Sequence, residues 1–159
     1  MAMFKVYGRG VERVDRARRV LGRACFLSGL DVVDFTTRTL EPNNYNIAYV
    51  KADKVVRSRL PEPCDYLVLL DEKVPAKAFD GLRDGCVIFS NSEEKVSPKN
   101  VKTKCHAIKS AIPEMALLGA LTKIFPKVSM KSMNSAIDME LGGEKILHSA
   151  FEEGYKGVK

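Results

Sequence analysis

The chain has 159 residues, 45% hydrophobic and 29% charged, so we expect one globular domain over residues 1–159 with its own buried core. No apolar run reaches the roughly 20 residues that span a bilayer, and the opening residues lack the regions of a secretory signal, so we expect a cytoplasmic protein without a membrane partner. The net charge of +6 arises in residues 1–60, which carry 12 Lys and Arg against 6 Asp and Glu and so indicate an anionic partner.

A glycine-containing turn joins the first predicted strand, Met3–Tyr7, to an amphipathic helix over about Val11–Ser28. At such a turn, backbone N–H groups and the positive end of the helix dipole face the same point, which favours an anionic ligand. Arg13 stands in the first helical turn, where a cation opposes the helix dipole unless an anion lies nearby. The candidate ligand contacts at this turn are therefore Gly8, Arg9, Gly10 and Arg13.

The middle of the chain predicts several strands and one short helix. Asp65–Asp71 is apolar between two acids, as expected for a parallel strand that is covered on both faces. Ile47–Lys51 and Lys54–Leu60 are typical of two antiparallel strands joined as a hairpin. The other elements expected here are the strands Asp31–Phe35, Gly85–Ser90 and Lys104–Lys109 and a helix over about Pro75–Arg83.

Three helices are predicted at the C-terminal end, over Pro113–Phe125, after Ser129, and over Glu144–Lys156. The first is apolar almost all round, which indicates either deep burial or an interface with another subunit. Its candidate interface residues are Met115, Leu118 and Leu121. The order of elements predicts an α/β fold with three layers (α/β/α), a mixed, mostly parallel sheet and a C-terminal helical segment.

Several kinds of catalytic or metal site lack their required residue pattern. The four cysteines are scattered and form no Cys-x-x-Cys pair, which disfavours a zinc or iron–sulfur site. No P-loop, Gly-x-Ser-x-Gly or His-Glu-x-x-His motif occurs. A dinucleotide enzyme stays open, with Asp34 as a ribose contact, although Arg13 replaces the third glycine of the fingerprint. Nucleic-acid binding is disfavoured because no aromatic residues are interleaved with the arginines of the first helix.

Five segments together indicate a family. The chain opens with a strand, Gly-Arg-Gly and the stretch RVLGRACFLSGLDVVDF. CDYLVLLD and FDGLRDGCVIFSNS then supply two strands with an acid between them, and MALLGALTKIFPKVSMKSMNSAI and AFEEGYK supply helices. MALLGAL and AFEEGY are the most specific pieces. From residue 3 to about residue 157 this order resembles the gamma subunit of the 2-oxoacid:ferredoxin oxidoreductases.

The resemblance implies a role inside a larger enzyme. Enzymes of this family decarboxylate 2-oxoacids with thiamine diphosphate, pass electrons through [4Fe–4S] clusters to ferredoxin and form acyl-CoA. The resemblance implies that this chain binds none of these cofactors and is not active alone. It would scaffold alpha and beta partners, with a delta or ferredoxin-like subunit, and its glycine turn would face the cleft where the substrate CoA enters.

Two motifs that face this cleft in the family are altered in this chain. Val-Glu-Arg stands at positions 11–13 in place of Gly-Gln-Gly, and residues 41–45 replace a Glu-x-Arg-Gly-Gly loop, with Asn43 and Asn44 as the candidate contacts. Side chains at positions 11–13 fill space through which a backbone could approach a phosphate. The alternatives are therefore a stand-alone module that binds a nucleotide or a CoA-like anion, or a non-catalytic homologue. A homodimer of the isolated chain also stays open.

Overall fold

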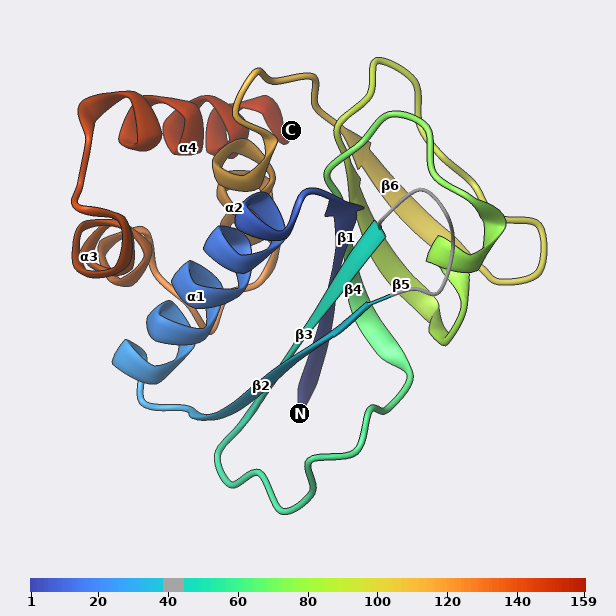
Figure 1. Cartoon of the computed structure of the whole chain (residues 1–159), viewed down its shortest axis with the longest axis horizontal. Coiled ribbons are helices and arrows are strands. Elements are labelled where there is room, and N and C mark those ends of the chain that lie inside the picture. The colour runs from blue at the N-terminus through green and yellow to red at the C-terminus, as the bar shows by residue number, and fades with distance from the viewer. Residues whose placement is uncertain (39–44) are drawn as a thin grey trace.

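The computed structural model describes residues 1–38 and 45–159, which form one six-stranded sheet with four α-helices and a 3-10 helix (Figure 1). The strands are β1 (Ala2–Arg9), β2 (Asp31–Arg38), β3 (Tyr45–Asp53), β4 (Cys64–Leu69), β5 (Leu82–Ser90) and β6 (Thr103–Ala107). The helices are α1 (Val11–Leu27), α2 (Pro113–Ile124), α3 (Met130–Leu141) and α4 (Lys145–Gly157), and η1 (Ala76–Phe79) is the 3-10 helix.

Strand β1 lies in the middle of the sheet, whose order is β2-β3-β1-β4-β5-β6. It pairs antiparallel with β3 and parallel with β4. The pairs β4–β5 and β5–β6 are parallel, and β2–β3 is antiparallel. The predicted mixed, mostly parallel sheet is thus confirmed. Because β1 and β4 are parallel neighbours, their carboxyl ends lie side by side, next to the start of α1.

The four α-helices cover one face of the sheet, and η1 covers part of the other (Figure 1). The α/β class and the C-terminal helices are confirmed, but the third layer is a single 3-10 turn. The helix expected over Pro75–Arg83 is wrong. Pro75 and Asp80 are extended and Gly81 has a φ of 74°, so the backbone leaves the helical region on both sides of η1. The buried ammonium of Lys5 holds η1 by donating to the carbonyls of Ala78 and Asp80, at 3.0 and 3.1 Å.

The predicted hairpin between Ile47–Lys51 and Lys54–Leu60 is also wrong. Strand β3 continues to Asp53 and already has β1 on one side and β2 on the other, so no edge is left for the next segment. That segment forms a loop instead. The ammonium of Lys51 holds the loop against the sheet through the carbonyl of Ser58 and the carboxylate of Glu62, at 3.1 and 2.8 Å.

Helices α2 and α4 pack against each other through glycines. A Cβ on Gly119 would lie 2.0 Å from the carbonyl oxygen of Phe151, and one on Gly154 would lie 1.7 Å from that of Ala116. Only glycine leaves room for the two backbones at this separation. Gly119 belongs to MALLGAL and Gly154 to AFEEGY, so the two most specific motifs of the sequence meet in space and form one helix–helix contact.

Candidate functional site

The turn between β1 and α1 requires glycine at positions 8 and 10 for two different structural reasons. A Cβ on Gly8 would lie 2.8 Å from the Cβ of Leu70, so this glycine allows β1 to approach the chain just after β4. Gly10 has a φ of 86°, in the left-handed region that favours glycine, and no atom of the described residues lies within 4 Å of the position of its Cβ. Gly10 is exposed and adds no side chain to cap α1, so the N-terminus of this helix is open to other groups.

A carboxylate of the same chain lies at this turn. Asp71 follows β4, and its Oδ2 accepts a hydrogen bond of 2.6 Å from the backbone N–H of Arg9. Its Oδ1 lies 3.1 Å from a terminal nitrogen of Arg13, and that nitrogen also donates to the carbonyl of Leu70. Asp71 therefore takes the two donors that the sequence assigns to an external anion.

The side chain of Arg9 lies over the ring of Tyr45, with its guanidinium carbon 5.2 Å from the ring centre. Tyr45 in turn stacks on Tyr7, with the ring centres 5.1 Å apart. Arg13 keeps one donor free within the described part of the chain, because its buried Nε has no hydrogen-bond partner there. The other two candidate contacts, Asn43 and Asn44, lie outside the described residues.

Asp71 is the site residue that sequence reasoning missed. In the sequence, Asp71 is the acid that ends the apolar strand predicted over Asp65–Asp71, and an acid at such a position is usually only the boundary of the strand. Its place beside Arg9 and Arg13 follows only from the parallel pairing of β1 with β4, which brings the two carboxyl ends together. A prediction of the strand order, with β1 next to β4, would have placed Asp71 at the turn.

The three candidate interface residues lie in the core. Met115, Leu118 and Leu121 have no exposed surface, because α2 packs against α4 and also contacts α1, α3 and β5. In this conformation they are not available to a partner, against the prediction of an interface. The apolar character of α2 all round reflects burial within the chain.

The arginines on the outer side of α1 form ion pairs within the chain. Arg19 and Arg23 both bind the carboxylate of Glu140 on α3, at 3.1 and 2.9 Å. Burial disfavours the charged form of Glu140, but these two hydrogen-bonded arginines outweigh it and lower its pKa below the ordinary value. Arg18 binds Asp34 at 2.9 Å, so this acid is engaged where a dinucleotide enzyme would use it for a ribose.

The cysteines behave as buried thiols. Burial raises the pKa of Cys25 and Cys86 to about 12 and that of Cys64 to about 11. Within residues 1–38 and 45–159, no group of three or more His, Cys, Asp and Glu side chains could hold a metal ion. In the same residues, no helix is both long and apolar enough to cross a membrane.

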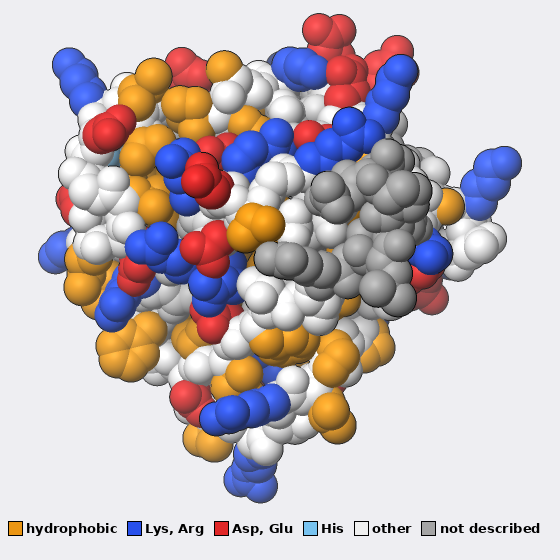
Figure 2. Space-filling model, viewed as in Figure 1, with side chains coloured by type: hydrophobic (Ala, Val, Ile, Leu, Met, Phe, Trp, Pro, Cys, Tyr) orange, Lys and Arg blue, Asp and Glu red, His pale blue; other side chains and the backbone are white. Residues whose placement is uncertain are grey.

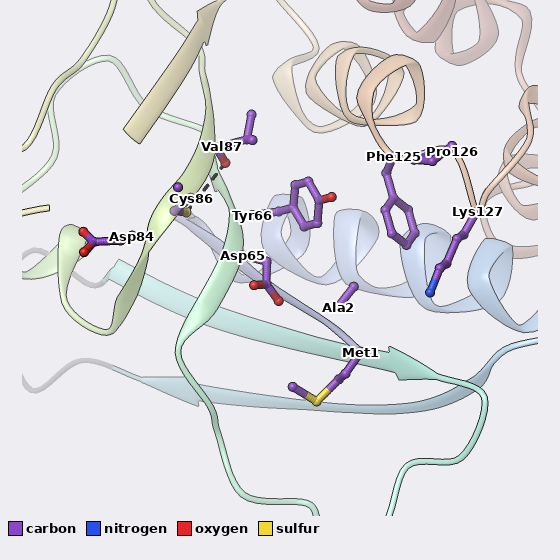
Figure 3. A pocket seen from close by; sticks show the side chains of 11 residues that line it. Met1, Ala2, Asp65, Tyr66, Asp84, Cys86, Val87, Phe125, Pro126 and Lys127 are labelled. Carbon is purple, nitrogen blue, oxygen red and sulfur yellow. Dashed lines mark hydrogen bonds between the residues drawn. The ribbon is translucent and has the colours of Figure 1, made fainter. Parts of the chain in front are cut away.

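A pocket of about 370 Å³ lies beside the amino ends of β1 and β4, at the other end of these strands from the turn (Figure 3). Tyr66 and Phe125 line it with rings 5.4 Å apart, and Lys127 stands at its side. The carboxylate of Asp65, on β4, accepts a hydrogen bond of 2.9 Å from the N–H of Met3 on β1. It also pairs with Arg83 on β5 at 3.2 Å. Asp65 thus links β1, β4 and β5 at this end of the strands.

Together, the sheet order, the helices on one face and the glycine turn define an α/β domain with a helix N-terminus at the carboxyl edge of its sheet. Solved structures show whose fold this is. A pyruvate oxidoreductase subunit, PORC, from Thermotoga maritima matches with a TM-score of 0.81, at 18% identity over 99% of this chain and 97% of that one. The gamma subunit of a keto/oxoacid ferredoxin oxidoreductase from Geobacter sulfurreducens matches with a TM-score of 0.80, at 18% identity over 99% and 98%.

The third structure is a longer chain. It is a 2-oxoglutarate:ferredoxin oxidoreductase from Magnetococcus marinus with 2-oxoglutarate, coenzyme A and succinyl-CoA bound, and it matches with a TM-score of 0.72 and 19% identity over 99% of this chain and 31% of that one. Neither a known family model nor a curated protein matches this sequence. The predicted resemblance is therefore confirmed at the level of the fold, which is that of the gamma subunit of 2-oxoacid:ferredoxin oxidoreductases.

Proposed function

We propose that this chain is a gamma-type subunit of a 2-oxoacid:ferredoxin oxidoreductase, an enzyme that oxidatively decarboxylates a 2-oxoacid to an acyl-CoA. The observation that carries the proposal is the fold match to two such subunits over nearly the whole of both chains. In this role the chain binds no cofactor itself and has no activity alone. Its alpha and beta partners, with a delta or ferredoxin-like subunit, hold the thiamine diphosphate and the [4Fe–4S] clusters, and CoA is the second substrate.

Within that enzyme, the chain acts mainly as a scaffold. The carboxylate of Asp71 already neutralises Arg13 and accepts from the N–H of Arg9, so a CoA phosphate at the turn has to compete with it. Positions 11 and 13 also carry the side chains of Val and Arg where the family has glycine. Steering of CoA by Arg9 and Arg13 therefore requires the phosphate to displace the carboxylate of Asp71 from these two residues.

Co-purification of the tagged chain from its source tests the assembly. We expect subunits that carry thiamine diphosphate and iron to elute with it, together with 2-oxoacid-dependent reduction of a ferredoxin or a viologen dye. The isolated chain serves as the control and is expected to show no such activity. A tagged chain that elutes without any subunit carrying thiamine or iron would refute the proposal.

The second candidate is a stand-alone module that binds a nucleotide or a CoA-like anion at the same turn. It is favoured by two features of the described residues: the buried Nε of Arg13 has no partner among them, and none of their atoms lies within 4 Å of a Cβ built on Gly10. Titration calorimetry of the isolated chain with CoA, NAD and ATP separates the two candidates. Micromolar affinity that Arg13→Ala abolishes supports the module, and no heat of binding supports the scaffold.

A further inference from the structure

The loop that follows β3 carries basic side chains without ion pairs. The acids close to it are engaged, since Asp53 binds the backbone N–H of Lys54 and Glu62 binds Lys51. Arg57 and Arg59 are exposed, and neither forms an ion pair with any residue of the described ranges. The arginines of α1 are paired with acids of the chain, whereas Arg57 and Arg59 of this loop have no such partner among the described residues.

Apolar side chains lie beside these charges. Leu60 is 72% exposed and Val55 is 60% exposed, although both are large aliphatic residues. On strand β2, the ring of Phe35 is half-buried and stacks on Tyr49 at 4.9 Å, on the sheet face away from the helices. In Figure 2, hydrophobic and basic side chains lie next to each other in the lower part of the view, over β2 and this loop.

Strand β2 is an edge strand with a pocket along it. In the described sheet only β3 pairs with β2, so the outer side of β2 has backbone groups open to another chain. A pocket of about 380 Å³ lies at this edge, and its lining consists of Val32, Val33, Asp34, Phe35 and Arg59. The acid in this lining, Asp34, is bound to Arg18 and does not neutralise Arg59.

We propose that strand β2 and the loop 54–60 form the surface onto which a catalytic partner subunit docks, and that the partner presents apolar side chains flanked by carboxylates. Charge complementarity selects this chemistry, because exposed apolar side chains next to unpaired arginines match an apolar centre with an acidic rim. The inference rests on the proposed function, since it places the partner subunit on this surface and away from α2.

Two pairs of variants test the surface in the full-length tagged chain. Arg57→Glu/Arg59→Glu reverses the charge at the loop, and Lys131→Glu/Lys145→Glu makes the same change at exposed lysines of the helical layer. Leu60→Asp places a charge in the apolar part, and Ile146→Asp does so at a side chain on α4 that is 59% exposed. Circular dichroism and the unfolding temperature confirm that each variant is folded. We expect the loop variants to recover about tenfold less thiamine- or iron-bearing subunit than wild type, and the controls to recover wild-type amounts.

The outcomes show which partner, if any, binds the surface formed by β2 and the loop 54–60. Loop variants that are folded and keep the partner overturn this inference and leave the proposed function standing. A wild-type chain without such a partner overturns both. An isolated wild-type dimer that Leu60→Asp converts to monomer assigns the surface to a second copy of the chain, and steeply salt-dependent binding of an oligonucleotide that Arg57→Glu/Arg59→Glu abolishes assigns it to nucleic acid. Support also requires that a photo-crosslinker at position 60 joins the partner at a peptide rich in Asp or Glu.

Discussion

Gly154→Ala is expected to destabilise the fold strongly through the contact between α2 and α4. The new Cβ would lie 1.7 Å from the carbonyl oxygen of Ala116, about half of an ordinary van der Waals separation. Overpacking typically costs about 1–3 kcal/mol, and we expect about 3–5 kcal/mol here because the clash is with backbone atoms and the two helices must separate over their whole contact to relieve it. The higher helix propensity of alanine returns about 1 kcal/mol. We therefore expect a net loss of about 2–4 kcal/mol in the free energy of unfolding.

Urea denaturation followed by circular dichroism measures this loss, and a thermal melt should show a fall of about 5–15 °C. Gly22→Ala is the matched control, because Gly22 lies within α1 and its added Cβ would meet its nearest atom, the Oδ2 of Asp34, at 3.4 Å. Here the gain in helix propensity stands alone, so the same substitution should stabilise by up to about 1 kcal/mol. A Gly154→Ala protein within 1 kcal/mol of wild type would refute the close glycine contact.

Three further changes have smaller expected effects. Asp71→Asn removes the charge that neutralises Arg13 and should cost about 1–2 kcal/mol in urea unfolding, whereas Glu152→Gln, at an exposed position of α4, should cost nothing measurable. The pKa of Glu140 is lowered in the folded state, so its carboxylate stabilises the fold at pH values above its ordinary pKa of 4.5. This stabilisation disappears as the pH falls through the pKa of the folded state. Glu140→Gln should therefore lose about 1 kcal/mol at pH 7, and an equal loss at pH 3 would contradict this origin. In the native protein a thiol reagent should modify Cys105 first, in a phase that Cys105→Ser removes, and should reach the other thiols only on unfolding, because burial raises the pKa of Cys25, Cys64 and Cys86 to about 11–12.

Local patterns in the sequence predict those parts of the fold whose cause is local. The 3.6-residue apolar period places α1, and Ser129 begins α3 by accepting a hydrogen bond from the N–H of Ser132, as predicted. The course of β3 depends on distant residues, because β1 and β2 flank it, and the predicted hairpin fails for that reason. Likewise, an all-round apolar helix predicts burial without showing what covers α2, which is α4.

The candidate site was predicted only in its first half. Arg9, Gly10 and Arg13 lie together because they follow one another in the chain, and the glycine pattern shows this. Asp71 follows a strand that comes about 60 residues later in the chain, and only the parallel pairing of β1 with β4 brings it to the turn. A property that depends on strand order is invisible to a reading of neighbouring residues.

The central position of β1 has a consequence for synthesis on the ribosome. Strand β1 emerges before β3 and β4, which must flank it, and residues Met3, Phe4, Val6 and Tyr7 have no exposed surface in the finished protein. At about 5–20 residues per second, β4 follows β1 by roughly 3–12 s. During that interval the nascent chain carries an apolar strand that at most one of its two neighbours, β3, can cover, and it depends on α1 or a chaperone to shield it.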